Sequence, residues 1–201
     1  PDRVSARNGL GLPLNRPLVL FVGRLTAVKR PDRLIEAMAL VLDTRPDAVL
    51  AIAGEGELLE ETRSRAEPLG ESVRFLGWQR DIAGLYAAAD CMVLTSDNEG
   101  MPVTLIEAAM AGVPSVTTDV GSAREVVLNE VTGLVVEPDA AAIADGLIRL
   151  LDDDLRGKLG AAARKRAEAE FGTRRLIADH EALYERLMAE LGAAARETDG
   201  G

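Results

Sequence analysis

Short apolar segments alternate with helical patterns along most of this 201-residue chain, and this alternation limits the possible folds more than any other feature. The apolar segments are 18–22, 48–53, 73–77, 91–95, 113–117 and 134–136. Between them, apolar residues recur at helical spacing, as at Leu34, Met38 and Val41. Apolar strands that are separated by helices pair in parallel and are covered on both faces. The sequence therefore predicts an α/β fold with a doubly wound parallel sheet and right-handed crossovers.

The order of these patterns also predicts how the chain is divided. Residues 1–16 hold few apolar side chains and are predicted to form a leading segment. Residues 17–191 are predicted to form one Rossmann-like domain, whose last part, from about residue 139, is entirely helical. The final helix, at about 174–191, carries a broad apolar stripe. Residues 192–201 end in Asp-Gly-Gly and are predicted to fray.

The composition excludes several classes of protein. Apolar residues make up 47% of the chain and charged residues 28%, which excludes disordered and fibrous proteins. A net charge of −10 and only 3% aromatic residues argue against a nucleic-acid partner. The single cysteine, Cys91, lies in a predicted buried strand, as is common in a reducing cytosol. Because no apolar run approaches ~18 residues and no signal peptide heads the chain, we expect a cytoplasmic chain without a membrane span.

Two carboxylates flank the start of one predicted helix. Glu99 follows the strand 91–95, and Glu107 lies about a turn and a half into a helix that begins near Pro102, since proline suits the first helical turn. Gly100 permits close approach to the backbone, and the first helical N–H groups point outward without partners. Such a corner suits a ligand with hydroxyl groups at two ends and phosphate in the middle, as in a nucleotide-sugar.

Two cations follow the first predicted strand. Arg24 and Lys29 lie in the loop after Gly23, at the carboxyl end of the sheet, where open parallel sheets bind their ligands. A planar guanidinium and a compact ammonium can converge on a diphosphate there. Taken alone, two such loop residues are more often solvated surface charges. Their position beside the corner formed by Glu99 and Glu107 favours the phosphate-binding interpretation.

The remaining motifs are weaker. Gly54-Glu55-Gly56 resembles the opening of a dinucleotide-binding fingerprint, but Leu59 stands at the third glycine position, so a tight turn that borders a ligand is the better interpretation. His180 is the only histidine, and its helical spacing from several leucines predicts a structural role. We expect no metal site and no cofactor, since no His, Cys and Asp cluster is evident. Trp78 is expected either at the edge of the core or near a base.

Together these motifs resemble the retaining nucleotide-sugar glycosyltransferases of family 4 (glycosyl transferases group 1), which have the GT-B fold. The matching segments are Phe21–Leu25 with Lys29, Ala53–Gly56, Phe75–Gly77, Ala89–Asp90, Glu99–Ala108, Ala111–Pro114, Glu125–Val127 and Thr132–Leu134. The two glutamates alone are moderately specific, and the ordered set, which covers roughly residues 10–190, is highly specific. Arg30 stands where many relatives have glycine, and we expect it to reshape only the start of the next helix.

The resemblance implies roles for individual residues. Glu99 would contact the hydroxyl groups of the donor sugar, and Glu107 would hold those of the ribose. Arg24 and Lys29 would bind the diphosphate, as a metal ion does in other transferases. The implied catalytic residues are Arg24, Lys29 and Glu99. The implied donor-binding residues are Gly23, Arg24, Lys29, Gln79, Arg80, Glu99, Gly100, Met101, Pro102, Val103 and Glu107, with the backbone around Trp78 at the edge of the base.

The resemblance also implies that a domain is missing. GT-B enzymes have two Rossmann-like domains, the acceptor domain first, and the first strand here already matches the donor domain. We therefore expect the donor-binding half of a retaining, metal-independent hexosyltransferase that binds a UDP- or GDP-sugar without transferring it alone. Any association with membranes would come through the missing acceptor domain. Two alternatives stay open: a sugar-nucleotide epimerase of related fold, whose acid and base residues the sequence does not show, and a non-catalytic nucleotide-sugar-binding module.

Overall fold

A six-stranded parallel sheet forms the centre of the computed structural model, which describes residues 1–198 and the side chains of residues 1–188. The strands are β1 (Leu18–Val22), β2 (Val49–Ala53), β3 (Val73–Gly77), β4 (Cys91–Leu94), β5 (Ser115–Thr118) and β6 (Gly133–Val136). Their order across the sheet is β3-β2-β1-β4-β5-β6, so the direction of winding reverses between β1 and β4. This is the strand order of Rossmann-like folds, and the predicted fold class is confirmed.

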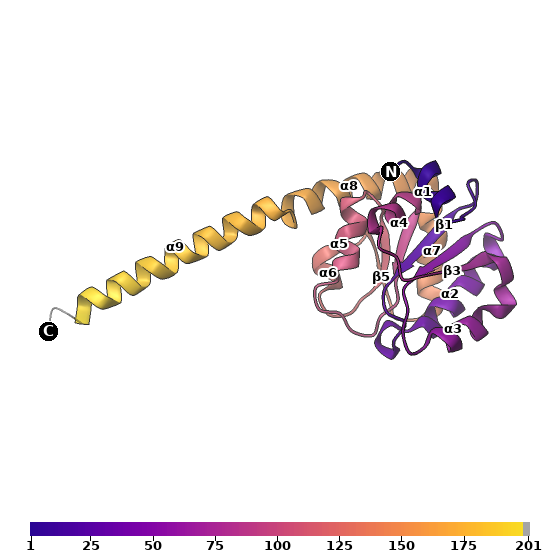
Figure 1. The fold of residues 1–201 in the computed structure, drawn as a ribbon, viewed down its shortest axis with the longest axis horizontal. Helices are drawn as coiled ribbons and strands as arrows, with labels where there is room; N and C mark the ends of the chain where they lie inside the picture. The colour runs from indigo at the N-terminus through magenta and orange to yellow at the C-terminus, as the bar shows by residue number, and fades with distance from the viewer. Residues whose placement is uncertain (199–201) are drawn as a thin grey trace.

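Helices cover both faces of the sheet (Figure 1). The helices are α1 (Arg3–Gly9), α2 (Pro31–Thr44), α3 (Leu59–Ala66), α4 (Ile82–Ala88), α5 (Val103–Met110), α6 (Ala123–Val126), α7 (Ala140–Leu150), α8 (Asp153–Glu170) and α9 (Thr173–Thr198), with short 3-10 turns at Ala27–Lys29 and Glu67–Ser72. Alternate residues of β1 enter two separate cores: Phe21 packs with α2 and α7, and Leu20 packs with α1, α4 and α5. Every side chain from Leu18 to Phe21 is therefore buried, as the apolar pattern predicts.

The leading segment contains a helix that the sequence patterns did not predict. In α1, Arg7 is fully buried, and its Nη2 donates to Oδ2 of Asp90 at 2.9 Å. The Nη1 of Arg7 donates to the carbonyl oxygens of Pro13, Leu14 and Arg16, which fixes the chain between α1 and β1. Burial lowers the pKa of the Arg7 guanidinium, although the charge of Asp90 opposes the shift. This segment is therefore tied to the core by a buried ion pair.

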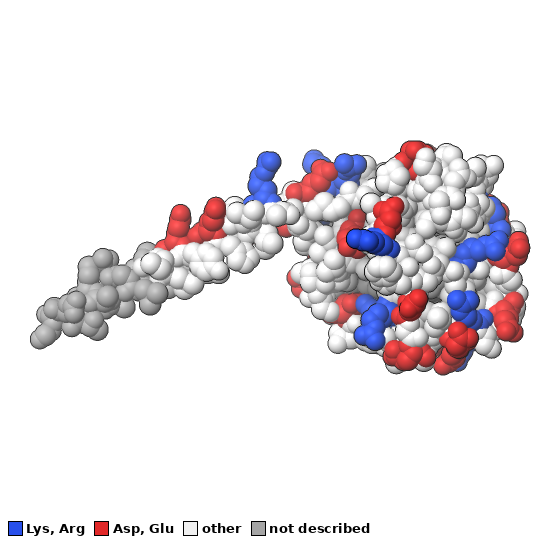
Figure 2. Space-filling view, viewed as in Figure 1, with Lys and Arg blue, Asp and Glu red and all other residues white. Residues whose placement is uncertain are grey.

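The last two helices differ in their environment. Helix α8 packs beside α5, where Ala109, Ala163 and Ala167 form a small cluster. Helix α9 extends away from the globular part (Figure 1), and in Figure 2 the charged side chains of its described part lie along one edge of the helix. The large apolar side chains of α9 are exposed, with Leu176 at 57% and Tyr184 at 62%. The side chains of the predicted frayed tail lie outside the described residues, as does the backbone of 199–201.

On the visible face of the globular part, basic and acidic side chains are interspersed rather than gathered into a patch of one sign (Figure 2). Within the part of the chain that the structure describes, no helix combines the length and the apolar character needed to cross a bilayer.

Candidate functional site

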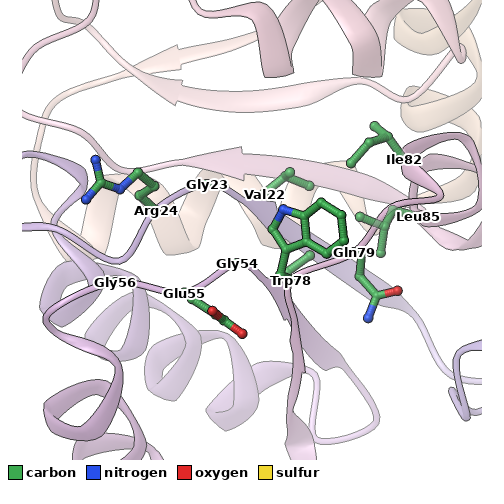
Figure 3. A pocket seen from close by; sticks show the side chains of 11 residues that line it. Val22, Gly23, Arg24, Gly54, Glu55, Gly56, Trp78, Gln79, Ile82 and Leu85 are labelled. Atoms are coloured by element: carbon green, nitrogen blue, oxygen red, sulfur yellow. The ribbon is translucent and has the colours of Figure 1, made fainter.

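The loops that follow β1, β2 and β3 enclose a cleft at the carboxyl edge of the sheet (Figure 3). Its volume is about 470 Å³, which falls in the range of small-ligand sites. Gly23, Arg24 and Gln79 of the predicted site line this cleft, together with Val22, Ile82 and Leu85 and with residues 53–56 and Trp78. The cleft therefore combines an apolar floor with a few polar groups at its rim, at the sheet edge where ligands of such folds bind.

Close backbone contact between two loops shapes the cleft. Gly54 has a φ of +143°, and a Cβ atom there would lie 1.9 Å from the carbonyl oxygen of Gly23. At Gly56 a Cβ atom would lie 2.3 Å from the carbonyl oxygen of Leu25, whose own N–H donates to the carbonyl oxygen of Glu55 at 2.9 Å. The Gly-Glu-Gly motif thus forms a tight turn that borders the cleft, in agreement with its interpretation from the sequence.

The two cations of the predicted phosphate site differ in whether a carboxylate pairs with them. The Arg24 side chain is exposed at one end of the cleft (Figure 3), and among the described residues no hydrogen bond or ion pair reaches it. The Nζ of Lys29, in contrast, lies 2.5 Å from Oε1 of Glu99. The structure therefore joins the lysine to the carboxylate that the resemblance assigns to the sugar, and leaves the arginine available to an anion.

A network of hydroxyl groups holds the Glu99 loop in place. The Oγ of Ser96 donates to Oε1 of Glu99 at 2.5 Å, and the Oγ1 of Thr118 donates to the carbonyl oxygen of Ser96 at 2.7 Å. The Oγ1 of Thr95 donates to the carbonyl oxygen of Lys29 at 2.7 Å. Ser96, Thr95 and Thr118 are all fully buried. The loops after β1, β4 and β5 are thereby connected behind the two charged side chains, and neither Ser96 nor Thr118 was predicted from the sequence.

Gly121 brings the next loop against Glu99. Its φ is +50°, and a Cβ atom there would lie 1.8 Å from the carbonyl oxygen of Glu99. The N–H of Ser122 donates to the same oxygen at 3.3 Å, so the turn before α6 supports the Glu99 loop. Gly100, by comparison, has open space around it, which leaves its backbone accessible.

Glu107 is held by a tyrosine that sequence reasoning missed. The hydroxyl of Tyr86 lies 2.9 Å from Oε2 of Glu107 and 3.1 Å from the carbonyl oxygen of Thr104, so it can donate to either acceptor. Tyr86 lies on α4 and is only 2% exposed. Burial and the negative charge of Glu107 raise the pKa of Tyr86, so the hydroxyl keeps its proton and donates. A buried tyrosine one helix away carries no sequence signal for this contact.

The helix that carries Glu107 begins as predicted. Pro102 is the N-cap residue of α5, and the first residue of the helix is Val103. Met101 and Val103 are largely exposed beside this helix start, at 48% and 60%. Of the predicted backbone contacts next to Glu99, Gly100, Met101 and Val103 are thus exposed, whereas Pro102 is buried.

The segment after β3 presents a tryptophan and an amide beside the cleft. Trp78 is 70% exposed and lies between Arg24 and Leu85 in the view of Figure 3, so the alternative of a place at the core edge is wrong. The Nε2 of Gln79 donates to the carbonyl oxygen of Leu76 at 2.6 Å, which folds this segment back on itself. Arg80 is exposed and does not line the cleft. Asp81 caps α4 by accepting from the N–H of Gly84, as expected for a helix start.

Arg30 occupies an unusual backbone conformation just before α2. Its φ is +50° and its ψ is +58°, values that glycine adopts readily and arginine does not. Its guanidinium pairs with Asp32 and Asp97, and the hydrogen bond from Arg30 lowers the pKa of Asp32 to about 2. Arg33 also donates to Asp97 at 2.7 Å, so Asp97 is an ion-pair partner of both arginines. Arg30 thus acts at the helix start, as expected.

The remaining titratable candidates lie away from the cleft. His180 is exposed on α9, with its Nδ1 2.8 Å from the carbonyl oxygen of Leu176. Cys91 is fully buried, and this burial raises the pKa of its thiol. Among the described side chains, no group of three His, Cys, Asp or Glu residues is arranged to hold a metal ion.

The strand order and the cleft at the carboxyl edge define a Rossmann-like domain with a nucleotide-sized site. The chain belongs to the family of glycosyl transferases group 1, whose family model matches residues 2–166. Thus the family that the sequence motifs indicated is confirmed.

Similar proteins extend this finding. A GDP-mannose-dependent monoacylated alpha-(1-6)-phosphatidylinositol monomannoside mannosyltransferase of Corynebacterium glutamicum is 36% identical over 181 residues, which is 85% of this chain and 47% of that protein. The structure of Anabaena HepE in complex with UDP and glucose matches with a TM-score of 0.82 and 25% identity over 92% of this chain and 51% of that one. The chain spans about half the length of the curated relatives it matches.

A second structure is matched by this chain over nearly all of that structure's length. It is the C-terminal domain of the Francisella tularensis glycosyl transferase group 1 family protein LpcC, with a TM-score of 0.77, 24% identity, and coverage of 86% of this chain and 94% of that one. At this identity the likeness concerns the fold alone.

Proposed function

We propose that this chain is the donor-binding half of a retaining glycosyltransferase that moves a hexosyl-type sugar from a nucleoside-diphosphate sugar to an acceptor. The observation that carries the proposal is the unpaired guanidinium of Arg24 at the rim of a cleft of about 470 Å³. An exposed arginine beside an apolar cleft is suited to a ligand with an anionic group joined to a flat, apolar base.

The phosphate contacts follow from the loop after β1. Arg24 binds the diphosphate with its planar fork, and Lys29 adds a second positive charge from the same loop. These groups stabilise the negative charge that develops on the departing diphosphate, which is the electrostatic contribution expected of a preorganised site. A metal ion is not needed in this scheme, because the two side chains supply the positive charge.

The glutamates recognise the two sugars of the donor. Glu107 accepts hydrogen bonds from the ribose, with its other oxygen held by Tyr86. Glu99 accepts from the transferred sugar through Oε2, since both Lys29 and Ser96 donate to Oε1. The backbone from Gly100 to Val103 lies beside the sugar and the phosphates. The base lies in the cleft near Trp78 and Gln79, and Arg80 follows them just outside the cleft.

The relatives support a hexosyl donor and a missing half. The Corynebacterium glutamicum relative is named for GDP-mannose, and the Anabaena structure holds UDP and glucose, so UDP- and GDP-sugars are the donors to test. The fold of an isolated C-terminal domain from a group 1 protein matches this chain. We propose that an acceptor domain completes the enzyme and that the present chain binds the donor without transferring it.

Isothermal titration calorimetry with UDP, GDP and their hexose derivatives tests the proposal. We expect one nucleotide to bind and Arg24→Ala to weaken its binding about tenfold, which corresponds to ~1.4 kcal/mol. Arg63→Ala is the matched control, because Arg63 is a half-exposed arginine on α3 that pairs with Glu60 away from the cleft. Failure of all these nucleotides to bind would contradict the proposal, and conversion of a bound UDP-sugar to its epimer would favour an epimerase instead.

A further inference from the structure

The short ion pair between Lys29 and Glu99 ties a phosphate-binding group to a sugar-binding group. Nζ of Lys29 and Oε1 of Glu99 are 2.5 Å apart, and the two side chains are 23% and 9% exposed. Ser96 donates to the same oxygen, and no hydrogen bond from a described residue reaches Oε2. One carboxylate oxygen is thus engaged by the protein, and the other is left as an acceptor.

The surrounding backbone keeps the two charges together. The carbonyl oxygen of Lys29 accepts from buried Thr95, and that of Ser96 accepts from buried Thr118. On the other side of the loop, Gly121 approaches the Glu99 carbonyl so closely that a Cβ atom would not fit. The backbone on both sides of the ion pair is therefore fixed, which favours a carboxylate that stays beside Lys29.

This geometry limits how far a bound phosphate can lie from the carboxylate. A phosphate oxygen that accepts from an ammonium lies about 2.8 Å from Nζ. Since Nζ is 2.5 Å from Oε1 of Glu99, that oxygen is at most about 5.3 Å from the negative charge. Any diphosphate held by Lys29 is therefore within range of repulsion by Glu99.

We propose that Glu99 determines specificity by charge, and favours the intact nucleoside-diphosphate sugar over the free nucleoside diphosphate. This inference rests on the proposed function. In the donor, the terminal phosphate is esterified by the sugar, whereas the free diphosphate carries an additional ionisable oxygen there, with a pKa near 6 for such a second ionisation. Glu99 offsets part of the attraction of Arg24 and Lys29 for this extra charge, and it accepts a sugar hydroxyl through Oε2.

The same arrangement assists release of the product. In the transfer, the hydroxyl oxygen of the acceptor bonds to the anomeric carbon and its proton passes to solvent, while the electron pair of the broken carbon–oxygen bond stays on the phosphate oxygen. The diphosphate product is therefore more negative than the donor, and this charge develops near the Glu99 carboxylate. Glu99 thus prevents the two cations of the site from holding the diphosphate product more tightly than the donor.

Two probes that differ only in this charge test the inference: UDP and its β-methyl ester, with GDP and its β-methyl ester as a parallel pair. Calorimetry gives the affinity ratio of free diphosphate to ester for each protein. We expect Glu99→Gln to raise this ratio about fourfold, the factor for two unit charges ~5 Å apart in water. Glu99→Ala removes the same charge and should shift the ratio in the same direction. The test therefore remains possible if one of the two variants does not fold.

Glu168→Gln is the control for a simple change in net charge. Glu168 is a half-exposed residue of α8 that pairs with Arg164, and it does not line the cleft. In this control variant, we expect the affinity ratio of free diphosphate to ester to change less than twofold. An unchanged ratio in both Glu99 variants would overturn the inference while leaving the proposed function intact. If neither nucleotide pair binds the unaltered protein, the proposed function fails first, and the inference fails with it.

Discussion

At the scale of single residues, the charged groups of the site differ in whether the protein already holds them. Arg24 has no partner among the described residues, whereas Lys29 is paired with Glu99 and Glu107 accepts from Tyr86. An unpaired cation can bind an incoming anion without first breaking a contact. The paired groups are instead held in set orientations by their partners, of which Tyr86 is buried and Lys29 is partly exposed.

Loss of the Tyr86 hydroxyl should weaken recognition of the ribose. In Tyr86→Phe, Glu107 loses a hydrogen bond of 2.9 Å and the orientation it imposes. Since a hydrogen bond to a charged group contributes about 1.5–3 kcal/mol, we expect roughly a tenfold loss of UDP or GDP affinity. The preference for the nucleotide over its 2′-deoxy form should fall in parallel, as calorimetry can measure.

Tyr184→Phe serves as the matched control for this prediction. Tyr184 is the second tyrosine of the chain, lies on α9 and is 62% exposed. It should leave both the affinity and the preference for ribose unchanged. A Tyr86→Phe protein that binds both nucleotides like the unaltered protein would contradict the role assigned to the hydroxyl.

The buried pair of Arg7 and Asp90 should matter for stability rather than for binding. Asp90→Ala leaves the Arg7 guanidinium buried with a lost partner and removes the acceptor of the Leu18 N–H, which is bonded at 2.7 Å. Breaking such a pair costs roughly 3–5 kcal/mol of unfolding free energy. Asp153→Ala removes a carboxylate that is 85% exposed and pairs with Arg156, so it should cost at most about 1 kcal/mol. Urea denaturation measures both values, and equal losses would refute the distinction.

The sequence predicted the loop positions of the site residues but not the contacts between residues that are far apart in the chain. The loop positions of Arg24, Lys29 and Glu99 follow from strand ends, because a parallel sheet brings its carboxyl ends to one edge. The pairing of Lys29 with Glu99 spans 70 positions, and its distance depends on loop backbone that no local pattern describes. Buried Arg7 was missed for a related reason, since an arginine in a short polar segment is usually exposed.

At the scale of elements, the predicted strands agree with the structure to within about two residues. The largest difference is the fifth strand, predicted over 113–117 and observed at Ser115–Thr118. Pro114 has no N–H to donate to a ladder, so the strand begins after it. The helix α1 has only seven residues, too short for a periodic apolar pattern to show.

The spacing between the β1 and β2 loops should depend on Gly54. Gly54→Ala would add a Cβ atom 1.9 Å from the Gly23 carbonyl oxygen at a φ of +143°. We expect a loss of roughly 3 kcal/mol in unfolding free energy, since backbone strain and overpacking each cost about 1–3 kcal/mol. Gly11→Ala has a φ of +64° but open space around it, so about 1 kcal/mol is expected there. Chemical denaturation of the two variants compares these costs, and similar values would exclude steric contact as the cause.

At the scale of the whole molecule, the exposed face of α9 and the length of the relatives both bear on the acceptor domain proposed above. The chain covers about half of its curated relatives. Leu176, Ile177, Tyr184 and Met188 of α9 are each more than half exposed. A continuous apolar stripe on an extended helix is unfavourable in water unless another surface covers it. We expect the proposed acceptor domain to cover part of this stripe.

The chain alone should therefore bind a donor but transfer no sugar at a useful rate. Positioning of donor and acceptor can supply roughly 7–11 kcal/mol of barrier reduction, and the proposed function assigns only the donor side to this chain. Incubation with a radiolabelled UDP- or GDP-hexose and candidate acceptors should yield no more than slow hydrolysis, whereas adding the amino-terminal half should restore transfer. Leu176→Gln with Ile177→Gln should weaken this restoration without lowering the melting temperature, because both side chains are already exposed. Rapid transfer by the isolated chain would show that it needs no second half.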